Sequence, residues 1–221
     1  MIKLQSLFFS YSKKHERIVF SAFKMRPHKR NKPRVLLALY AQPDQPEYPH
    51  YALLITPKFK PSLHQNLGDK EQAPIPATKY HVQKSRQNLQ GELFRPWQFE
   101  KTDIADIDRD PGILVCTMIG KVLDLKRLKY VLPTTPVYQL NHPDQVRALN
   151  FDDHTWARDG YQELKDHHII AGIDWTAAEE GANAFMRQKH NNDPWAAGCS
   201  EGRNQPLVPI VDLTSGCMLR T

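Results

Sequence analysis

Five short runs rich in apolar, β-branched and aromatic residues precede every strongly helical pattern in this chain, and this order constrains the fold most. Their length and composition suit strands better than helices. Strands followed by helices, without βαβ alternation, are typical of an α+β protein. We therefore expect an α+β fold with a mainly antiparallel sheet of about five strands, followed by flanking helices. The strands are expected over residues 34–40, 50–57, 78–83, 97–100 and 112–122.

Three helical patterns occupy the second half of the chain. In the middle one, Trp156, Gly160 and Leu164 recur at a spacing of four residues and share one face. Asp152 or Asp153 can cap its first turn, where a carboxylate also suits the helix dipole. The helices are expected over residues 124–132, 153–167 and 176–190.

The net charge of +6 is confined to one end of the chain. The first 34 residues hold ten Lys or Arg and one acidic residue, so the rest of the chain is slightly acidic. We expect a basic flexible arm over residues 1–33, a single α+β domain over 34–190 and a loosely attached tail over 191–221. Within that tail, residues 208–211 (VPIV) are apolar enough to dock as an edge segment.

The compartment follows from the cysteines and from the arm. Cys116, Cys199 and Cys217 are odd in number and form no CxxC pair, which favours a reducing, cytoplasmic setting. The arm is also basic, serine-containing and poor in acid, so residues 1–24 equally suit a mitochondrial presequence, and Met25 is an alternative start. No run is long and apolar enough to predict a membrane span.

Two histidines and a carboxylate form the candidate site. His50 opens the strand expected over 50–57 and His81 lies within the strand expected over 78–83. If these strands pair, both imidazoles can face one cleft, opposite Asp153 in the first turn of the helix. Imidazoles beside a carboxylate suit acid–base catalysis near neutral pH. The alternative is two hydrogen-bonded strand histidines and a simple helix cap, without chemistry.

The order of the motifs HYALLI, KYHV, WQFE, GILVCTMIGKV and VLPTTPV resembles a family of small fungal proteins of unknown function. That family in turn resembles permuted papain-like folds such as the lecithin:retinol acyltransferase group. The resemblance covers residues 34–190. It implies that His50 is a general base, that His81 orients it, and that Trp156 ends the helix motif. Asp153 falls where the group has its nucleophilic cysteine, so thiol acyl transfer is not expected.

Three functions remain open. The first is a papain-like protein without the cysteine, which binds or transforms a small molecule through His50, His81 and Asp153, for example in a biosynthetic pathway. Asp152, Trp156 and Tyr51 would line its pocket. The second is a non-catalytic scaffold or interaction protein, a pseudoenzyme whose partner is another protein. The third is nucleic-acid binding through the arm, which is disfavoured because the arm lacks a binding motif and the core is acidic.

Cofactors are not expected. Two imidazoles and one carboxylate are also the ligand set of a facial metal triad, but the same groups serve equally well as a hydrogen-bonded pair with a second histidine nearby. The sequence therefore predicts a metal-free polar pocket in which a carboxylate raises the pKa of a histidine.

Overall fold

The computed structural model describes residues 31–42, 45, 48–58, 73–89, 92–192 and 208–220. Residues 31–221 form one compact unit. Two parts of the expected organisation lie outside the described residues, namely residues 1–30 of the basic arm and residues 193–207 of the tail.

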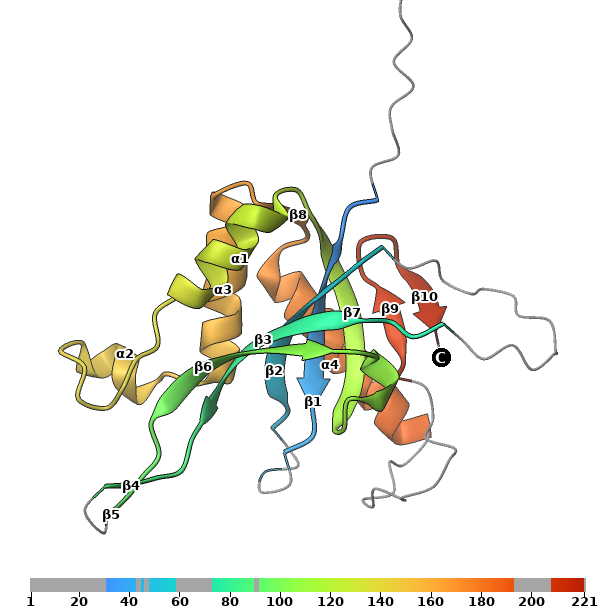
Figure 1. The fold of residues 1–221 in the computed structure, drawn as a ribbon. Coiled ribbons are helices and arrows are strands. Elements are labelled where there is room, and N and C mark those ends of the chain that lie inside the picture. Colours follow the sequence, from blue (N-terminus) through green and yellow to red (C-terminus); the bar gives the residue numbers. More distant parts are fainter. Residues whose placement is uncertain are drawn as a thin grey trace, which may run out of the picture. The chain divides into compact units, whose positions relative to one another are not determined.

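An eight-stranded mixed sheet forms the centre of this unit (Figure 1). Its strands lie in the order β10-β9-β7-β1-β2-β3-β6, and β8 pairs with β7 outside this path. Pairing between the described strands is antiparallel except between β7 and β9, which are parallel. The principal strands are β1 (Arg34–Tyr40), β2 (His50–Thr56), β3 (Ala77–Lys84), β6 (Trp97–Ile104) and β7 (Ile113–Val122).

All five expected strands are present, but the sheet is larger than five strands. The additions are β8 (Ile170–Gly172), β9 (Ile210–Asp212) and β10 (Cys217–Arg220), and a separate hairpin joins β4 (Gln87–Leu89) to β5 (Glu92–Phe94). Strands of three or four residues are too short to show a periodicity, which is why the sequence does not reveal most of them.

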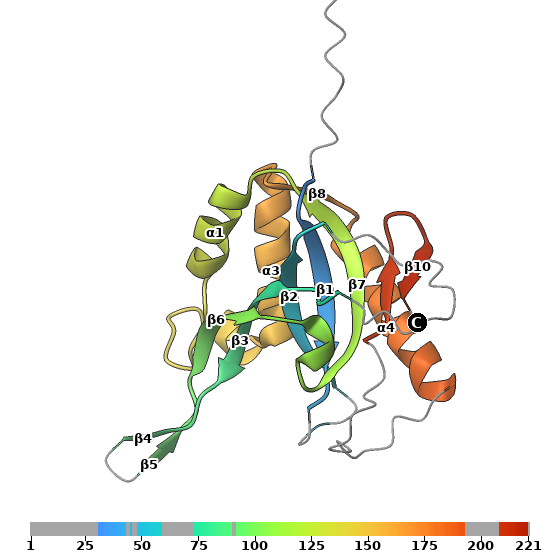
Figure 2. The same ribbon diagram turned by 45° about the vertical axis from the view of Figure 1, so that its right-hand side comes forward.

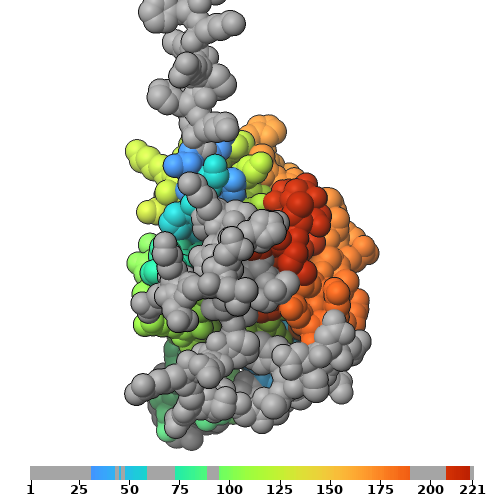
Figure 3. Space-filling view, turned by 90° about the vertical axis from the view of Figure 1, so that its right-hand side faces the viewer, coloured from blue at the N-terminus to red at the C-terminus, as the bar shows by residue number. Residues whose placement is uncertain are grey.

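The segment with Ile210 and Val211 docks on the sheet, but not at its edge. β9 lies between β7 and β10, so residues 210–212 and 217–220 are part of the sheet. The turn after β9 brings Leu213 against Gly181 of the last helix. A Cβ atom added at position 181 would lie 2.7 Å from Leu213 Cδ1. Figure 3 shows the red β9–β10 segment beside the orange helix.

Helices cover one face of the sheet (Figures 1 and 2). The three expected helices are present, and a short helix and a 3-10 turn add to them. Asp124, Asp144 and Asp152 cap α1, α2 and α3 by accepting hydrogen bonds from backbone N–H groups in the first turn. The helices are α1 (Leu125–Thr134), α2 (Gln145–Leu149), α3 (Asp153–Asp166) and α4 (Trp175–Asn192), and the 3-10 turn is η1 (Ile107–Arg109).

The alternation of strand residues divides the buried side chains between two cores. In β1, Val35, Leu37 and Leu39 face α1, α3 and α4, whereas Leu36 and Ala38 face the opposite side. Nearly every residue of β1 and β2 is buried, so both faces of these central strands are covered. We call the two clusters the helix-side core and the far-side core.

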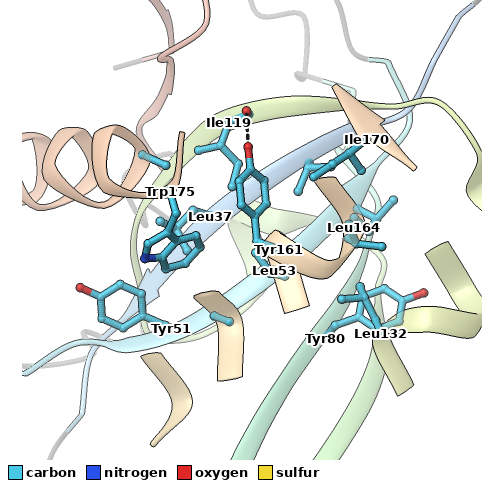
Figure 4. Close-up of a cluster of buried hydrophobic side chains, with 14 of the residues drawn as sticks. Leu37, Tyr51, Leu53, Tyr80, Ile119, Leu132, Tyr161, Leu164, Ile170 and Trp175 are labelled. Carbon is cyan, nitrogen blue, oxygen red and sulfur yellow. Dashed lines mark hydrogen bonds between the residues drawn. The ribbon is translucent and has the colours of Figure 1, made fainter. Parts of the chain in front are cut away.

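Tyr161 of α3 ties the helix-side core to the sheet (Figure 4). Its hydroxyl lies 3.1 Å from Ile119 O of β7 and 2.9 Å from Ile173 O after β8. This close approach requires a glycine at position 172, because a Cβ there would meet the Tyr161 hydroxyl and lie 2.6 Å from Ile119 O.

In the part of the chain that the structure describes, no helix has the length and apolar character needed to cross a membrane.

We predict that Gly172→Ala destabilises the fold, because the added methyl group displaces Tyr161 from the Ile119 and Ile173 carbonyl groups. Overpacking of this kind costs about 1–3 kcal/mol. Chemical denaturation of the variant measures the loss. Ala171→Ser, at the exposed neighbouring position, is the control and should change the free energy of unfolding by less than about 0.5 kcal/mol. Equal stability of the two variants would contradict the prediction.

Candidate functional site

The candidate site begins where β2 and β3 separate. Their ladder runs from Ile55 opposite Thr78 to Leu53 opposite Tyr80 and ends there. β2 continues to His50 with β1 as its partner, and β3 continues through His81 with β6 as its partner. The two histidines therefore lie beyond the last paired residues of β2 and β3.

The first residue of α3 fills this gap. Asp153 Oδ2 accepts a hydrogen bond from the backbone N–H of Tyr51, which has no partner in β3. The same oxygen lies 3.0 Å from His50 Nδ1. α3 packs on the helix-side core. His50 is the pairing partner of Tyr40, whose side chain belongs to the far-side core. The carboxylate of Asp153 therefore links the two faces of the sheet.

The contact continues through the second histidine. His50 Nε2 lies 2.9 Å from His81 Nδ1, and the two rings meet edge to face with their planes at 81°. His81 Nε2 lies 3.8 Å from Glu100 Oε2, an electrostatic contact that is longer than a direct hydrogen bond. Glu100 stands opposite His81 in the register of β3 and β6. We call these four residues the carboxylate–histidine chain, in the order Asp153, His50, His81, Glu100.

The structure thus brings together the three residues that the sequence singled out. Asp153 and His81 are buried, with 7% and 5% of their surface exposed, and His50 is partly exposed. Asp153 lies within hydrogen-bonding distance of His50, and His50 of His81. The expected geometry is therefore present, while the catalytic roles of these residues stay predictions.

The pKa of His81 is lowered from the ordinary value of 6.5. Burial is the main cause of its lowering to about 3, the neighbouring His50 and Lys79 add to the effect, and Asp153 opposes it. A buried imidazole loses the hydration that would stabilise its charged form. His81 is therefore a neutral imidazole near neutral pH. The carboxylate of Asp153 contacts His50 and not His81.

The side chains of the three residues expected to line a pocket contact other parts of the protein. Trp156 is fully buried in the helix-side core, with its ring 5.6 Å from that of Phe99, so it is a core residue. Asp152 caps α3 by accepting from the Thr155 N–H, 2.7 Å away. The Tyr51 ring packs edge to face against His154, and its hydroxyl contacts Asn183 of α4.

A second polar cluster adjoins His50. The Tyr40 hydroxyl donates to Asp110 Oδ2 at 2.5 Å, and the Lys79 ammonium lies 3.5 Å from the same oxygen and over the Tyr40 ring. Burial and the adjacent carboxylate raise the pKa of Tyr40, so its hydroxyl stays protonated. The Tyr40 ring contacts His50 edge to face, which connects this cluster to the carboxylate–histidine chain.

Sequence reasoning missed Glu100 and this second cluster. Strand alternation places Lys79 on the same face as His81, which the sequence alone could have indicated. The position of Glu100 depends on the register between β3 and β6, for which no local sequence signal exists.

The described residues were compared with the requirements of a metal site and of a ligand pocket. Among them, no three His, Cys, Asp or Glu side chains converge as a metal site. An open hollow of about 610 Å³ lies on α2 and α3, between Tyr138, Arg147 and Arg158. None of the residues that line it belongs to the carboxylate–histidine chain.

Together, the fold and the site define an α+β protein with a histidine pair held between carboxylates at a gap in its sheet. Over residues 32–216 the chain matches a family of unknown function, DUF6914, and it belongs to that family. No curated protein matches the chain, and no solved structure does.

We predict that His81 makes the fold acid-sensitive. Its pKa is lower in the folded protein than the ordinary value of 6.5, so below about pH 6.5 the unfolded chain binds a proton that the folded protein excludes. The free energy of unfolding should therefore fall as the pH drops from 6.5 towards 3, by up to about 1.4 kcal/mol per pH unit from this group. Thermal unfolding at several pH values measures this slope.

His81→Gln keeps a hydrogen-bond acceptor but does not titrate, so its slope over this range should be shallower than that of the native chain. His167→Gln removes an exposed histidine from the end of α3 and is the control. Parallel slopes for His81→Gln and the native chain would contradict the prediction.

Proposed function

We propose that this protein binds or transforms a small molecule by acid–base chemistry at Asp153, His50 and His81, in a permuted papain-like arrangement without the nucleophilic cysteine. The observation that carries the proposal is the 3.0 Å contact between Asp153 Oδ2, at the N-terminus of α3, and His50 Nδ1 at the start of β2.

The order of contacts supports the papain-like part of the proposal. In the lecithin:retinol acyltransferase type of site, a strand histidine lies between a residue at a helix N-terminus and a polar partner on the next strand. Here one nitrogen of His50 contacts Asp153 and the other contacts His81. In this proposal Asp153 takes the position in which that type of site has its cysteine.

A carboxylate at this position acts on a ligand as a base, whereas a thiolate would act as a nucleophile. An ionised carboxylate at this position accepts a proton from a bound hydroxyl group or a water molecule, and His50 stabilises its charge. The His81 ring fixes the orientation of His50, since its neutral Nδ1 lies against His50 Nε2. Asp153 is the general base in this proposal, and both histidines orient and stabilise it.

One observation favours the alternative of a non-catalytic scaffold. Both ring nitrogens of His50 already have partners within the protein, and Asp153 and His81 are buried. A site whose polar groups already have partners within the protein holds β2, β3 and α3 together whether or not a ligand binds. The two functions differ in whether a small molecule reaches position 153.

Replacing Asp153 by cysteine tests the proposal without a known substrate. We predict that Asp153→Cys creates a thiol whose pKa is lowered by His50 and by the N-terminus of α3. At pH 6 it should react with iodoacetamide roughly ten times faster than an ordinary thiol, after allowance for the lower nucleophilicity of a stabilised thiolate. Mass spectrometry of the alkylated protein at timed intervals gives the rate. The variant is made with Cys199 and Cys217 replaced by serine, because Cys217 is exposed and Cys116 is buried.

Asp152→Cys in the same background is the matched control, because it places a thiol at the same helix terminus without contact to His50. Adding His50→Gln to Asp153→Cys should remove the advantage over this control. Equal rates for the thiols at positions 152 and 153 would refute the papain-like arrangement. A thiol at position 153 that iodoacetamide cannot reach in a folded variant would favour the scaffold.

A further inference from the structure

β6 is the last strand at one edge of the sheet, and β3 uses only half of its backbone groups. In an antiparallel strand, successive residues direct their N–H and C=O groups to alternate sides. Pro96 O accepts from the Ser85 N–H on the β3 side at 3.0 Å, whereas both backbone groups of Trp97 face the other way, towards the Gln139 side chain. The even-numbered residues of β6 therefore pair with β3, and the odd-numbered residues face outward.

A side-chain amide protects the first outward residue of this edge. Gln139 Oε1 accepts from the Trp97 N–H at 3.1 Å, and Gln139 Nε2 donates to Trp97 O at 2.6 Å, as a neighbouring strand would. The next outward residues are Phe99, Lys101 and Asp103. Within the described residues, no hydrogen bond reaches the outward N–H and C=O groups of these three. An unpaired row of this kind is a template for pairing with another strand.

The chain turns away from this edge at its other end. After Ile104 it enters the 3-10 turn η1, where the Ile107 N–H donates to Ile75 O and the Ile107 side chain is buried in the far-side core. The free edge therefore runs from Phe99 to Ala105, between Gln139 at one end and η1 at the other.

The side chains in the middle of the free edge are complementary to themselves. Lys101, Thr102 and Asp103 are consecutive and exposed. If a second copy of β6 lies antiparallel to the first, with its Thr102 opposite Thr102, then Lys101 of each copy lies opposite Asp103 of the other. Opposite charges and Thr–Thr pairs stabilise antiparallel strands at such positions. Phe99 then lies opposite Ala105, so the free edge is paired over its whole length.

Other registers of the same two strands are disfavoured. Because outward residues pair only with outward residues, the neighbouring registers place Lys101 opposite Lys101 or Asp103 opposite Asp103. Like charges directly opposite each other are destabilising. A larger shift either shortens the ladder or brings the second strand against Gln139, which already occupies the backbone of Trp97.

We propose that the free edge of β6 is a homodimer interface, at which two copies of this chain pair antiparallel about Thr102 and join their sheets into one. Lys101 and Asp103 of the two copies exchange backbone hydrogen bonds, and their side chains form ion pairs. A twofold axis perpendicular to the sheet relates the copies, so the helix-covered faces lie on the same side. This inference goes beyond the proposed function and does not rest on it.

The oligomeric state of the full chain tests the proposal. Contacts through a single strand edge are at the small end of specific interfaces, below about 1,200 Å², so the dimer should dissociate on dilution. Sedimentation velocity from micromolar to millimolar protein should show a monomer that converts to a dimer. A chain that stays monomeric over this range would overturn the proposal and leave the edge to an extended peptide of another protein.

Charge reversal identifies the surface and the register. Lys101→Glu and Asp103→Lys each place like charges opposite one another in the homodimer, so each variant should dimerise at least about tenfold more weakly than the native chain. When the two variants are mixed, every opposed pair has one acidic and one basic side chain, and a heterodimer should form. Lys126→Glu makes the same charge change at an exposed residue of α1 and is the matched control, which should dimerise as the native chain does. A dimer that is equally sensitive to Lys126→Glu, or a mixture that stays monomeric, would overturn the proposal.

Amide hydrogen exchange provides a readout at the backbone itself. In a single copy the N–H groups of Lys101 and Asp103 are unpaired and should exchange rapidly, whereas those of Glu100 and Thr102 face β3. Raising the protein concentration should slow exchange at Lys101 and Asp103 and leave Glu100 and Thr102 nearly unchanged. Unchanged exchange at Lys101 and Asp103 in a chain that dimerises would place the contact elsewhere and overturn the proposal.

Discussion

The structure depends on one carboxylate, that of Asp153, which enters the gap where β2 and β3 separate. Without it the Tyr51 N–H would be a buried donor without a partner, at a cost of about 1–3 kcal/mol. The same oxygen contacts His50, which contacts His81. One side chain therefore completes the hydrogen bonding of β2, holds the N-terminus of α3 against the sheet and connects the helix-covered face to the histidines.

Local patterns in the sequence were sufficient to predict the main elements. The runs that became β1, β2, β3, β6 and β7 have the apolar, β-branched composition of strands, and the capping aspartate of α3 marks its start. The proximity of His50, His81 and Asp153 was expected from the assumed pairing of the two histidine-bearing strands and from the resemblance to the papain-like group. The strands and helices themselves depend on residues that are close together in the chain.

Features that depend on pairing between strands far apart in the sequence were not predictable. Nothing near Glu100 indicates that it stands opposite His81, since that requires the register of two strands joined by a hairpin. Trp156 shows a second limit of reasoning from local sequence. An aromatic residue one turn into a helix suits a pocket wall or a core equally well, and only the packing of Phe99 against it decides in favour of the core. The size of the sheet was underestimated for the same reason, because β9 finds its partner almost a hundred residues earlier.

The parallel pairing of β9 with β7 has a consequence for biosynthesis. β7 pairs with β1 on one side. On the other side its C-terminal end pairs with β8, and its centre pairs with residues 210–212, which leave the ribosome long after β7 does. During that interval Cys116, Thr117 and Met118 present an open, apolar strand edge to other chains. Until residues 210–212 emerge and pair, these backbone groups are available for pairing with another strand edge.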